Sequence, residues 1–380
     1  MPRPPFPPLP DPAGLAPHVV ALCREAAEGI EFESFLVGVR AARLARSVPE
    51  DAFQAWKGAL RRLAGGVLAE DWVTRGRRPE FVRPELLLVF DADRDQVEPR
   101  LRPVYVYGRY RKLVRDLPQT QARWKHEPCR GKGCPECEGT GKLYRVALED
   151  LLGAPAARAF QAEGWQLHGL GREDVDVRCL GPGRPFVLEL VAPRRRQADL
   201  IALGAEIAAA AAGRVELARP LVPAGEEAVP RLKASEARKE YRARVRPQRP
   251  PDPEALLRRA AALTGCELAQ RTPERVSRRR ADKVRPRRVH ECQLLGQDPE
   301  GFDLRLVTAA GTYIKELISG DEGRTTPSVT ELLGVPCVCA ELDVLGVEAD
   351  DAALLAPASS SSAALTGAEE GVESVPYDAG

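Results

Sequence analysis

The amino-acid sequence predicts an α+β protein that contains more than one domain. Its 380 residues exceed the usual length of a single domain and provide ample material for a buried core. The pattern also changes along the chain, because apolar residues recur at helical spacing between 18 and 68, whereas β-rich runs follow at 85–90 and 102–107. A cluster of cysteines at 129–137 then separates this first region from a longer one.

The first third of the chain is expected to contain an extended arm and a small α+β module. Residues 1–15 are rich in proline, which favours a polyproline conformation. A short strand at 35–39 interrupts the helical pattern that runs from 18 to 68. Together with the two β-rich runs that follow, these elements predict a module over 16–125.

A longer α+β region is predicted over 146–350. Its expected elements are strands at 175–180 and 185–192, a helix near 200–212, and strands near 286–295, 302–309 and 336–346. Helix start and stop signals predict one further helix within 326–334. The segment 351–380 is acidic and rich in Ser and Ala, and is expected to be a disordered tail.

The net charge of +1 averages over two regions of opposite charge. Residues 231–290 contain 19 Lys/Arg and 7 Asp/Glu, whereas 341–380 contain 9 Asp/Glu and no Lys or Arg. A basic segment beside an acidic tail favours a polyanionic partner, with the tail as a solvating end or as a competitor for the basic surface. A charge mix that only keeps the protein in solution is the alternative interpretation.

The sequence contains no signal for membrane insertion or secretion. No run approaches the roughly 18 apolar residues that span a bilayer, and the Pro-rich N-terminus lacks the apolar centre of a signal peptide. We therefore expect a cytoplasmic protein without a membrane partner. In a reducing compartment the 9 Cys do not predict disulfides, so those that cluster need another explanation.

The clustered cysteines belong to one eight-residue unit that occurs twice within the segment 126–145. His126 and Cys129 stand in the first unit, and Cys134 and Cys137 in the second, each pair with a two-residue gap and a following Gly-x-Gly. Two tight turns with four soft ligands are what a structural zinc site requires. A redox pair and a metal-free remnant are the alternatives, but a redox pair needs only one unit.

Two further motifs carry the side chains of a candidate reaction. Gly171-Arg-Glu-Asp-Val-Asp-Val-Arg178 delivers Asp174 from a turn, and Gly311-Thr-Tyr-Ile-Lys-Glu-Leu317 carries Tyr313 and Lys315, which an extended strand would place on one face. A carboxylate opposite a phenol and a cation suits a reaction without an organic cofactor. Taken alone, Asp174 could instead cap a strand, Tyr313 could be a core aromatic and Lys315 a solvated charge.

The motif at 171–178 resembles the active-site loop of pseudouridine synthases, which in one branch reads Gly-Arg-Thr-Asp-x-Gly-Val. The resemblance is strongest to the archaeal and eukaryotic tRNA synthases that modify T-loop uridines 54 and 55. It extends over most of 100–335. Its further motifs are Arg109-Tyr-x-Lys-Leu-Val-Arg-Asp-Leu-Pro-Gln-Thr120, the Cys/His units, Gly181-x-Gly-Arg-Pro-Phe186, Arg271-Thr-Pro-x-Arg-Val-x-Arg-Arg-Arg-Ala-Asp282 and 311–329. Family members often carry a further Cys pair near the N-terminus, where this chain has Cys23, and a Cys at position 126.

The resemblance implies a fold, a reaction and roles for single residues. It implies an N-terminal THUMP-like RNA-binding domain, a zinc-knuckle insert and a pseudouridine synthase catalytic domain with a mixed sheet flanked by helices. Asp174 would start the isomerisation by attack on C1′ or by removal of a C2′ proton. Tyr313 would pack under the flipped base, and Lys315 would pair with Asp174 and keep it ionised. Asp176, which lies on the same face as Asp174, is the second choice for the nucleophile.

The basic segment 231–290 is expected to hold the RNA. Its candidate contacts are Tyr241, Arg278, Arg279, Arg280, Lys283, Arg285, Arg287 and Arg288. Phosphate contacts along this segment would offset the cost of extruding the uridine and would make binding depend on salt. A solvated Arg-rich helix is the alternative.

The expected function is therefore a tRNA pseudouridine synthase that acts on the T-arm with a structural zinc ion and no organic cofactor. No motif indicates an obligate protein partner. A non-catalytic RNA-binding protein with the same fold is the main alternative. A THUMP-type methyltransferase or thiouridine synthetase is disfavoured, because no Gly-rich nucleotide loop follows a strand.

Overall fold

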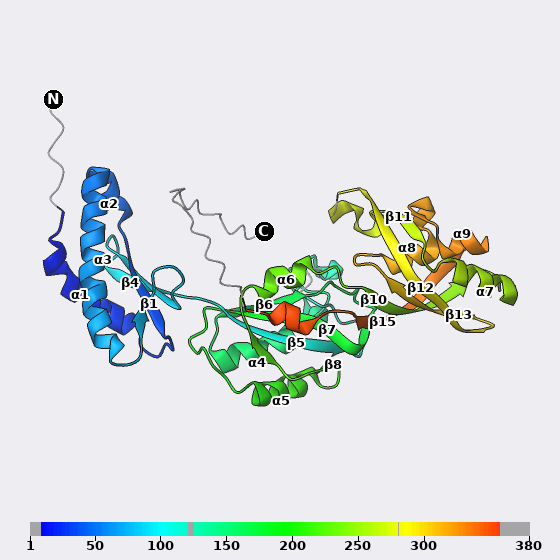
Figure 1. The fold of residues 1–380 in the computed structure, drawn as a ribbon, viewed down its shortest axis with the longest axis horizontal. Helices are drawn as coiled ribbons and strands as arrows, with labels where there is room; N and C mark the ends of the chain where they lie inside the picture. Colours follow the sequence, from blue (N-terminus) through cyan, green and yellow to red (C-terminus); the bar gives the residue numbers. More distant parts are fainter. Residues whose placement is uncertain (1–8, 121–124, 280, 358–380) are drawn as a thin grey trace, which may run out of the picture.

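A computed structural model describes residues 9–120, 125–279 and 281–357 of the chain. Its fold is mixed α+β, as the sequence predicts. A small N-terminal module lies at one end of an elongated molecule, and one long sheet with its helices forms the rest (Figure 1). Each part has its own cluster of buried apolar side chains.

The N-terminal module contains a sheet of order β2-β1-β3-β4 with helices against it. Its elements are α1 (Pro12–Ala26), β1 (Ser34–Arg40), α2 (Ala42–Ser47), α3 (Glu50–Val73), β2 (Arg78–Pro79), β3 (Leu86–Asp91) and β4 (Gln96–Leu101). Helix α1 starts inside the predicted arm, because the Asp11 carboxylate accepts hydrogen bonds from the backbone N–H groups of Ala13 and Gly14. Pro12 suits the first helical position, where no backbone N–H is required.

The large sheet has the order β14-β11-β12-β13-β10-β15-β7-β5-β8, with β6 added to β7 and β9 added to β5. Its strands are β5 (Val104–Lys112), β6 (Gly164–Gly169), β7 (Arg178–Val191), β8 (Val215–Leu217), β9 (Val222–Ala224), β10 (Lys239–Pro247), β11 (Glu267–Arg271), β12 (Val284–Asp298), β13 (Gly301–Thr308), β14 (Thr325–Thr326) and β15 (Cys337–Val347). Strand β5 pairs with β7, so the N-terminal module ends before it, earlier than the predicted boundary at 125.

The two halves of the large sheet meet at a short parallel pairing. Arg178 and Cys179 at the start of β7 pair with Asp343 and Val344 of β15. The Asp343 carboxylate is buried between the guanidinium groups of Arg178, at 2.7 Å, and Arg115, at 2.9 Å. The loop that carries Asp174 leads directly into this junction.

Helices cover both halves of the large sheet. They are α4 (Leu148–Phe160), α5 (Leu200–Ala211), α6 (Ala228–Ala234), α7 (Pro253–Ala262), α8 (Ile314–Ser319), α9 (Val329–Leu333) and α10 (Asp351–Leu355), with short 3₁₀ turns η3 (Glu274–Arg279) and η4 (Asp321–Gly323). Helices α4 and α5 pack on each other near β6, β7 and β8, whereas α7 packs on β12 and α8 on β15.

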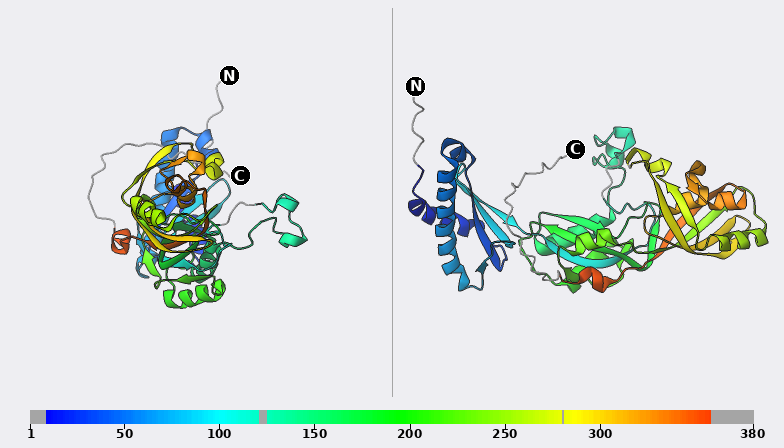
Figure 2. Two further views of the ribbon diagram at one scale, coloured as in Figure 1. Left: turned by 90° about the vertical axis from the view of Figure 1, so that its right-hand side faces the viewer. Right: turned by 45° about the horizontal axis from the view of Figure 1, so that its top comes forward.

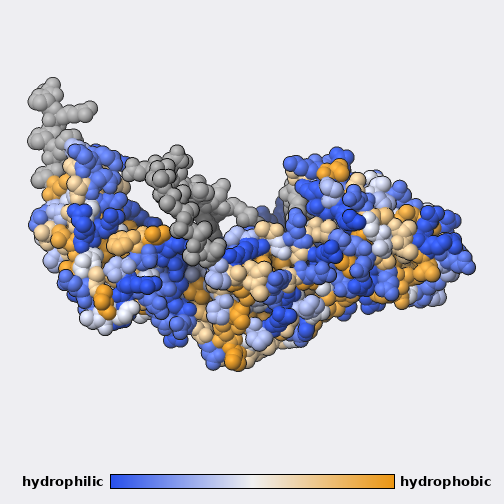
Figure 3. Space-filling model, in the orientation of Figure 1, coloured by the Kyte–Doolittle hydropathy of each residue, from blue (hydrophilic) through white to orange (hydrophobic). Residues whose placement is uncertain are grey.

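The Cys/His segment forms the 3₁₀ turns η1 (Glu127–Cys129) and η2 (Pro135–Cys137) and protrudes from the part of the molecule that holds the large sheet (Figure 2). No residue of 125–145 belongs to either apolar cluster of the described chain. Hydrophilic residues cover most of the face seen in Figure 3. None of the described helices is long and apolar enough to cross a membrane.

Candidate active site

A buried lysine binds the backbone of the loop between β6 and β7 that carries Asp174. Lys112 stands at the end of β5 and has no exposed surface. Its ammonium donates to the backbone carbonyls of Asp174 at 3.1 Å, Val175 at 2.9 Å and Leu117 at 2.8 Å. Burial lowers the pKa of this ammonium. Three carbonyl acceptors thus fix the backbone from which the Asp174 side chain leaves.

A second buried group anchors the residue before Asp174. The carboxylate of Glu173 is fully buried and lies 2.8 Å from the guanidinium of Arg184. The hydroxyl of Tyr110 donates to Glu173 at 3.0 Å and accepts from the amide of Gln119 at 2.7 Å. That amide also donates to the Gly171 carbonyl at 3.2 Å. Neighbouring acidic residues of the motif therefore have different roles. Glu173 points into the protein and anchors the loop, whereas Asp174 is partly exposed to solvent.

Tyr313 and Lys315 do not lie on an extended strand, so the predicted strand at this motif is wrong. Tyr313 stands at the N-cap position of α8, and Lys315 stands in the first turn of that helix. Residues two apart do not face the same way in a helix, so the strand argument for their shared face fails. The buried amide of Gln270 holds Tyr313 instead, donating to its carbonyl at 2.9 Å and accepting from its N–H at 2.8 Å.

Two carboxylates and two cations meet where α8 faces the loop. The Lys315 ammonium donates to both oxygens of Asp176, at 2.9 and 2.8 Å, and lies 3.4 Å from Asp174. The Arg275 guanidinium lies 3.0 Å from Asp174. Although burial acts to raise the pKa of Asp176, the hydrogen bond from Lys315 holds it below its usual value. The same contact raises the pKa of Lys315 against the effect of burial.

Arg275 is a site residue that the sequence interpretation missed. It comes from η3 and bridges the Asp174 carboxylate and the buried carboxylate of Glu316, which it reaches at 2.6 Å. Its guanidinium carbon lies 6.0 Å from the centre of the Tyr313 ring, within the range of a cation–π contact. Arg275 falls within a motif of the family resemblance, but no local pattern indicates a partner 101 residues away.

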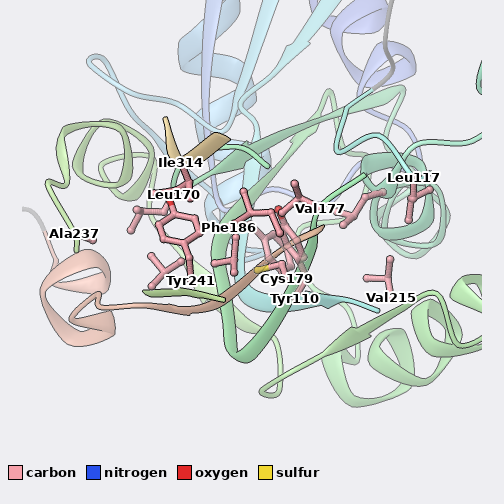
Figure 4. Packing of buried hydrophobic residues seen from close by; sticks show 14 of the residues in the cluster. Tyr110, Leu117, Leu170, Val177, Cys179, Phe186, Val215, Ala237, Tyr241 and Ile314 are labelled. Atoms are coloured by element: carbon pink, nitrogen blue, oxygen red, sulfur yellow. The ribbon is translucent and has the colours of Figure 1, made fainter. Parts of the chain in front are cut away.

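Tyr241 differs from its predicted role as an exposed stacking surface. It lies on β10, is only 8% exposed, and its ring points toward Leu170 and Ile314 (Figure 4). Burial raises the pKa of its hydroxyl to about 12. No hydrogen-bond partner of that hydroxyl is found in the described part of the chain. The ring thus packs beside Leu170, which precedes the Asp174 loop, and beside Ile314 of α8.

The predicted phosphate contacts are distributed over β12 and the turn before it. Lys283 is exposed, Arg285 is partly buried and donates to the Thr272 hydroxyl at 2.9 Å, and Arg287 is partly buried. Arg288 is exposed. The side chains of Arg278 and Arg279, and the whole of Arg280, lie outside the described residues. The predicted alternative of an Arg-rich helix does not hold for β10 and β12, which are strands.

The four predicted metal ligands converge. Their ligand atoms lie within 4.8 Å of one another, with Sγ–Sγ distances of 3.9 Å (Cys129–Cys137) and 3.7 Å (Cys134–Cys137). The Nδ1 atom of His126 lies 3.5 Å from the Cys134 Sγ. A tetrahedral zinc ion with bonds of about 2.3 Å to sulfur and about 2.0 Å to nitrogen requires edges of roughly 3.8 and 3.5 Å. The donor set and its spacing therefore fit a metal ion of this kind.

The repeated glycines of the two units have a direct structural reason. A Cβ on Gly133 would collide with the carbonyl of Gly139, and a Cβ on Gly141 would collide with the carbonyl of Gly131. The two turns can therefore lie against each other only without side chains at these positions. Against the effect of burial, backbone N–H groups from Cys134 and Gly141 lower the pKa of the Cys137 thiol to about 6, which favours the thiolate that metals bind.

Comparisons with known proteins identify the family. The family model described as "Pus10, C-terminal" matches residues 105–348. The chain belongs to the Pus10 family. The match starts within β5 and ends after β15, so it covers the large sheet and leaves out the N-terminal module. The family and the enzyme class predicted from the motifs are confirmed.

Curated members of the Pus10 family resemble the chain over most of its length. A tRNA pseudouridine synthase Pus10 from Archaeoglobus fulgidus is 40% identical over 320 residues, 83% of this chain and 87% of the relative. The proteins of the same name from Methanothrix thermoacetophila and Korarchaeum cryptofilum are 39% identical (84% of this chain, 71% of the relative) and 44% identical (70% of each). A solved Cbf5-Nop10-Gar1 complex contains a chain that matches 51% of this one at 19% identity, covers 43% of its own length and has a TM-score of 0.33.

Proposed function

We propose that the protein isomerises uridine to pseudouridine in tRNA, at position 54 or 55 of the T-loop or at both. Membership of the Pus10 family supports the reaction, and the contacts of Asp174 support its location. This carboxylate is 39% exposed, stands on an anchored loop and is flanked by Lys315 and Arg275. A reacting ribose can reach it, while the two cations stabilise negative charge at the same place.

The proposed reaction exchanges one bond to the sugar for another. The C1′–N1 bond of uridine breaks, the uracil turns and a C1′–C5 bond forms. The C5 proton leaves to solvent and N1 takes up a proton, so the product is an isomer of the substrate. Asp174 would start this by attack on C1′ or by removal of the C2′ proton. Neither route needs a redox step or an energy source, in agreement with a site built from carboxylates, cations and a tyrosine.

We assign the surrounding side chains according to their contacts. Tyr313 is proposed to pack under the flipped base, because Gln270 fixes its backbone beside the carboxylates. Lys315 is proposed to pair with Asp174 during the reaction, with Asp176 holding it in place. Tyr241 is proposed to contact the extruded base from the floor of the site, and not an exposed stretch of RNA.

The rest of the chain is proposed to hold the tRNA. Exposed cations of β12 and the turn before it would neutralise phosphates, with Arg278, Arg279 and Arg280 extending this surface. The N-terminal module is proposed to be a THUMP-like domain that docks the acceptor end, supported by its separate sheet and core. The Cys/His segment is proposed to hold structural zinc through His126, Cys129, Cys134 and Cys137, because four protein ligands leave no position for a reactant.

Tritium release from [5-³H]uridine-labelled unmodified tRNA tests this function. Wild type should release tritium and Asp174→Ala should not, although both bind the tRNA. Transcripts that carry cytidine at position 54 or at position 55 then identify the modified uridine. Release by neither protein, with tight binding by both, would instead support a non-catalytic RNA-binding protein. Release by Asp174→Ala but not by Asp176→Ala would move the nucleophile to Asp176.

A further inference from the structure

Lys239 is a buried cation without a carboxylate partner in the described chain. It stands at the start of β10 with 7% of its surface exposed, two residues before Tyr241 and on the same face of the strand. The hydrogen bond of its ammonium goes to the Ala237 carbonyl at a long 3.3 Å. Burial and the neighbouring cations Arg184 and Arg287 lower the pKa of Lys239 to about 8. Such a charge is costly to bury unless another group compensates for it.

The two neighbouring cations differ in their own partners. Arg184 is already neutralised by Glu173. Arg287, on β12, donates to the carbonyl of Pro286 at 3.0 Å and is not paired with a carboxylate among the described residues. Lys239 and Arg287 are therefore neighbouring positive charges, one buried and one partly buried, and neither has a carboxylate partner among the described residues.

Each of these two cations lies directly behind an exposed glycine of an active-site loop. A Cβ on Gly171 would stand 3.1 Å from Nη1 of Arg184 and 3.2 Å from Cε of Lys239, and a Cβ on Gly311 would stand 3.0 Å from Nη2 of Arg287. Positive φ values of 81° and 74° already favour glycine at these positions. The absence of side chains also leaves both cations open to a ligand that approaches over the loops.

We propose that Lys239 and Arg287 form a subsite for one phosphodiester group of the RNA, next to the reacting uridine. The inference rests on the proposed function and names a contact within it. Gly171 precedes Asp174 by three residues, so their Cα atoms are at most about 11 Å apart, and Gly311 precedes Tyr313 by two, so theirs are at most about 7 Å apart. A phosphate adjoining the flipped uridine lies at that range, whereas a more distant part of the tRNA does not.

The subsite differs in kind from the exposed cations of the basic segment. Exposed cations bind phosphates diffusely and in exchange with counterions. A buried cation has a defined position, so one phosphate on it would set the depth and orientation of the nucleotide whose base is extruded. Lys239 and Arg287 would act as positioning residues, because they touch the substrate's backbone and not its reacting atoms.

The test combines protein variants with a T-arm RNA in which single phosphates are replaced by neutral methylphosphonates. Lys239→Met removes the buried charge, and Arg287→Met is a second variant at the more exposed half of the subsite. Arg242→Met is the matched control, because Arg242 lies on the opposite face of β10 and pairs with Asp303 at 3.2 Å. Binding is measured by fluorescence anisotropy, and turnover by single-turnover tritium release at saturating full tRNA.

One methylphosphonate beside the target uridine should weaken wild-type binding about 10-fold, as should Lys239→Met with unmodified RNA. The two changes combined should weaken binding no further than either change alone. The slope of the logarithm of the binding constant against the logarithm of the salt concentration should become shallower by about one. Lys239→Met should also unfold at a higher urea concentration than wild type, which separates the effect on RNA from misfolding. Any loss of binding caused by Arg242→Met should be the same for every RNA of the series, because this residue lies on the opposite face of β10.

Additive losses at every phosphate, or unchanged binding by both Lys239→Met and Arg287→Met, would overturn the subsite. Should Lys239→Met fail to fold, the same cycle is read from Arg287→Met. If wild type turns over normally but the losses from the protein variant and from the methylphosphonate add up, the subsite is rejected and the proposed enzyme function is not. A non-additive cycle without any tritium release by wild type supports the subsite but rejects the proposed enzyme function, so the two failures are distinguishable.

Discussion

Lys315 pairs more closely with Asp176 than with Asp174 at the candidate active site. The ammonium donates to both carboxylate oxygens at 2.9 and 2.8 Å, whereas its distance to Asp174 is 3.4 Å. Asp174 is bound more closely by Arg275, at 3.0 Å. The two acidic residues of the loop thus have different partners, and this difference separates the effects expected of their substitution.

Asp174→Asn should abolish turnover while leaving tRNA binding close to that of wild type. The amide keeps the size of the carboxylate but cannot act as nucleophile or base, so the single-turnover rate should fall by at least about 10³-fold. Tritium release at saturating tRNA measures the rate, and filter binding measures affinity. A variant that retains a tenth of the wild-type rate would contradict the assignment of Asp174.

Asp176→Asn should slow the reaction without abolishing it. The Lys315 ammonium would lose its charged partner and turn toward Asp174, so we expect a fall in rate of about 10- to 100-fold with little change in affinity. Lys315→Met should cause a loss at least as large. If Asp176→Asn were as inactive as Asp174→Asn, Asp176 would have a direct part in the chemistry.

Arg275→Met should destabilise the protein by about 1–3 kcal/mol, below the value for a fully buried ion pair because Arg275 is 41% exposed. The reason is Glu316, whose carboxylate is 5% exposed and would be left buried without its partner. Urea unfolding gives the change, and adding Glu316→Gln should recover most of it. Equal stability of the single variant and wild type would mean that water reaches Glu316.

Removal of the metal should disorder the Cys/His segment and leave the rest of the protein folded. Residues 125–145 contribute nothing to either apolar cluster of the described chain, so chelation or Cys134→Ser should change the main unfolding midpoint by only a few degrees. Elemental analysis should find one zinc per chain in wild type. Hydrogen exchange should increase within this segment, and a collapse of the whole protein would contradict its isolation.

The stability gained by Lys239→Met should depend on pH. The pKa of Lys239 is about 8 in the folded protein and 10.5 as its ordinary value, so the unfolded chain binds more protons between these values and wild-type stability rises with pH there. The difference between variant and wild type should be largest below pH 8, at ~1–3 kcal/mol, and should shrink toward pH 10.5. Urea unfolding at several pH values measures it, with Arg242→Met as the control.

The periodicity of apolar residues along the sequence correctly predicted several helices and strands. The strand expected at 35–39 lies within β1, the Ala-rich helix near 200–212 is α5, and the strand near 302–309 is β13. Strand β10 was not recognised, although Tyr241, Ala243 and Val245 alternate with arginines as a half-buried strand requires. The segment was interpreted by its many arginines, and the alternation of apolar and charged residues that predicts a strand was therefore overlooked.

The sequence by itself determined the family, the four side chains that converge in the Cys/His segment, and the loop that carries Asp174. These depend on residue types at fixed short spacings, and the backbone geometry of a turn converts such spacings directly into positions. Only the tertiary structure decided which charges meet. The pairing of Arg275 with Asp174, the burial of Lys239 and the place of β5 in the large sheet follow from contacts between distant strands, whose register is set by the packing of the whole sheet.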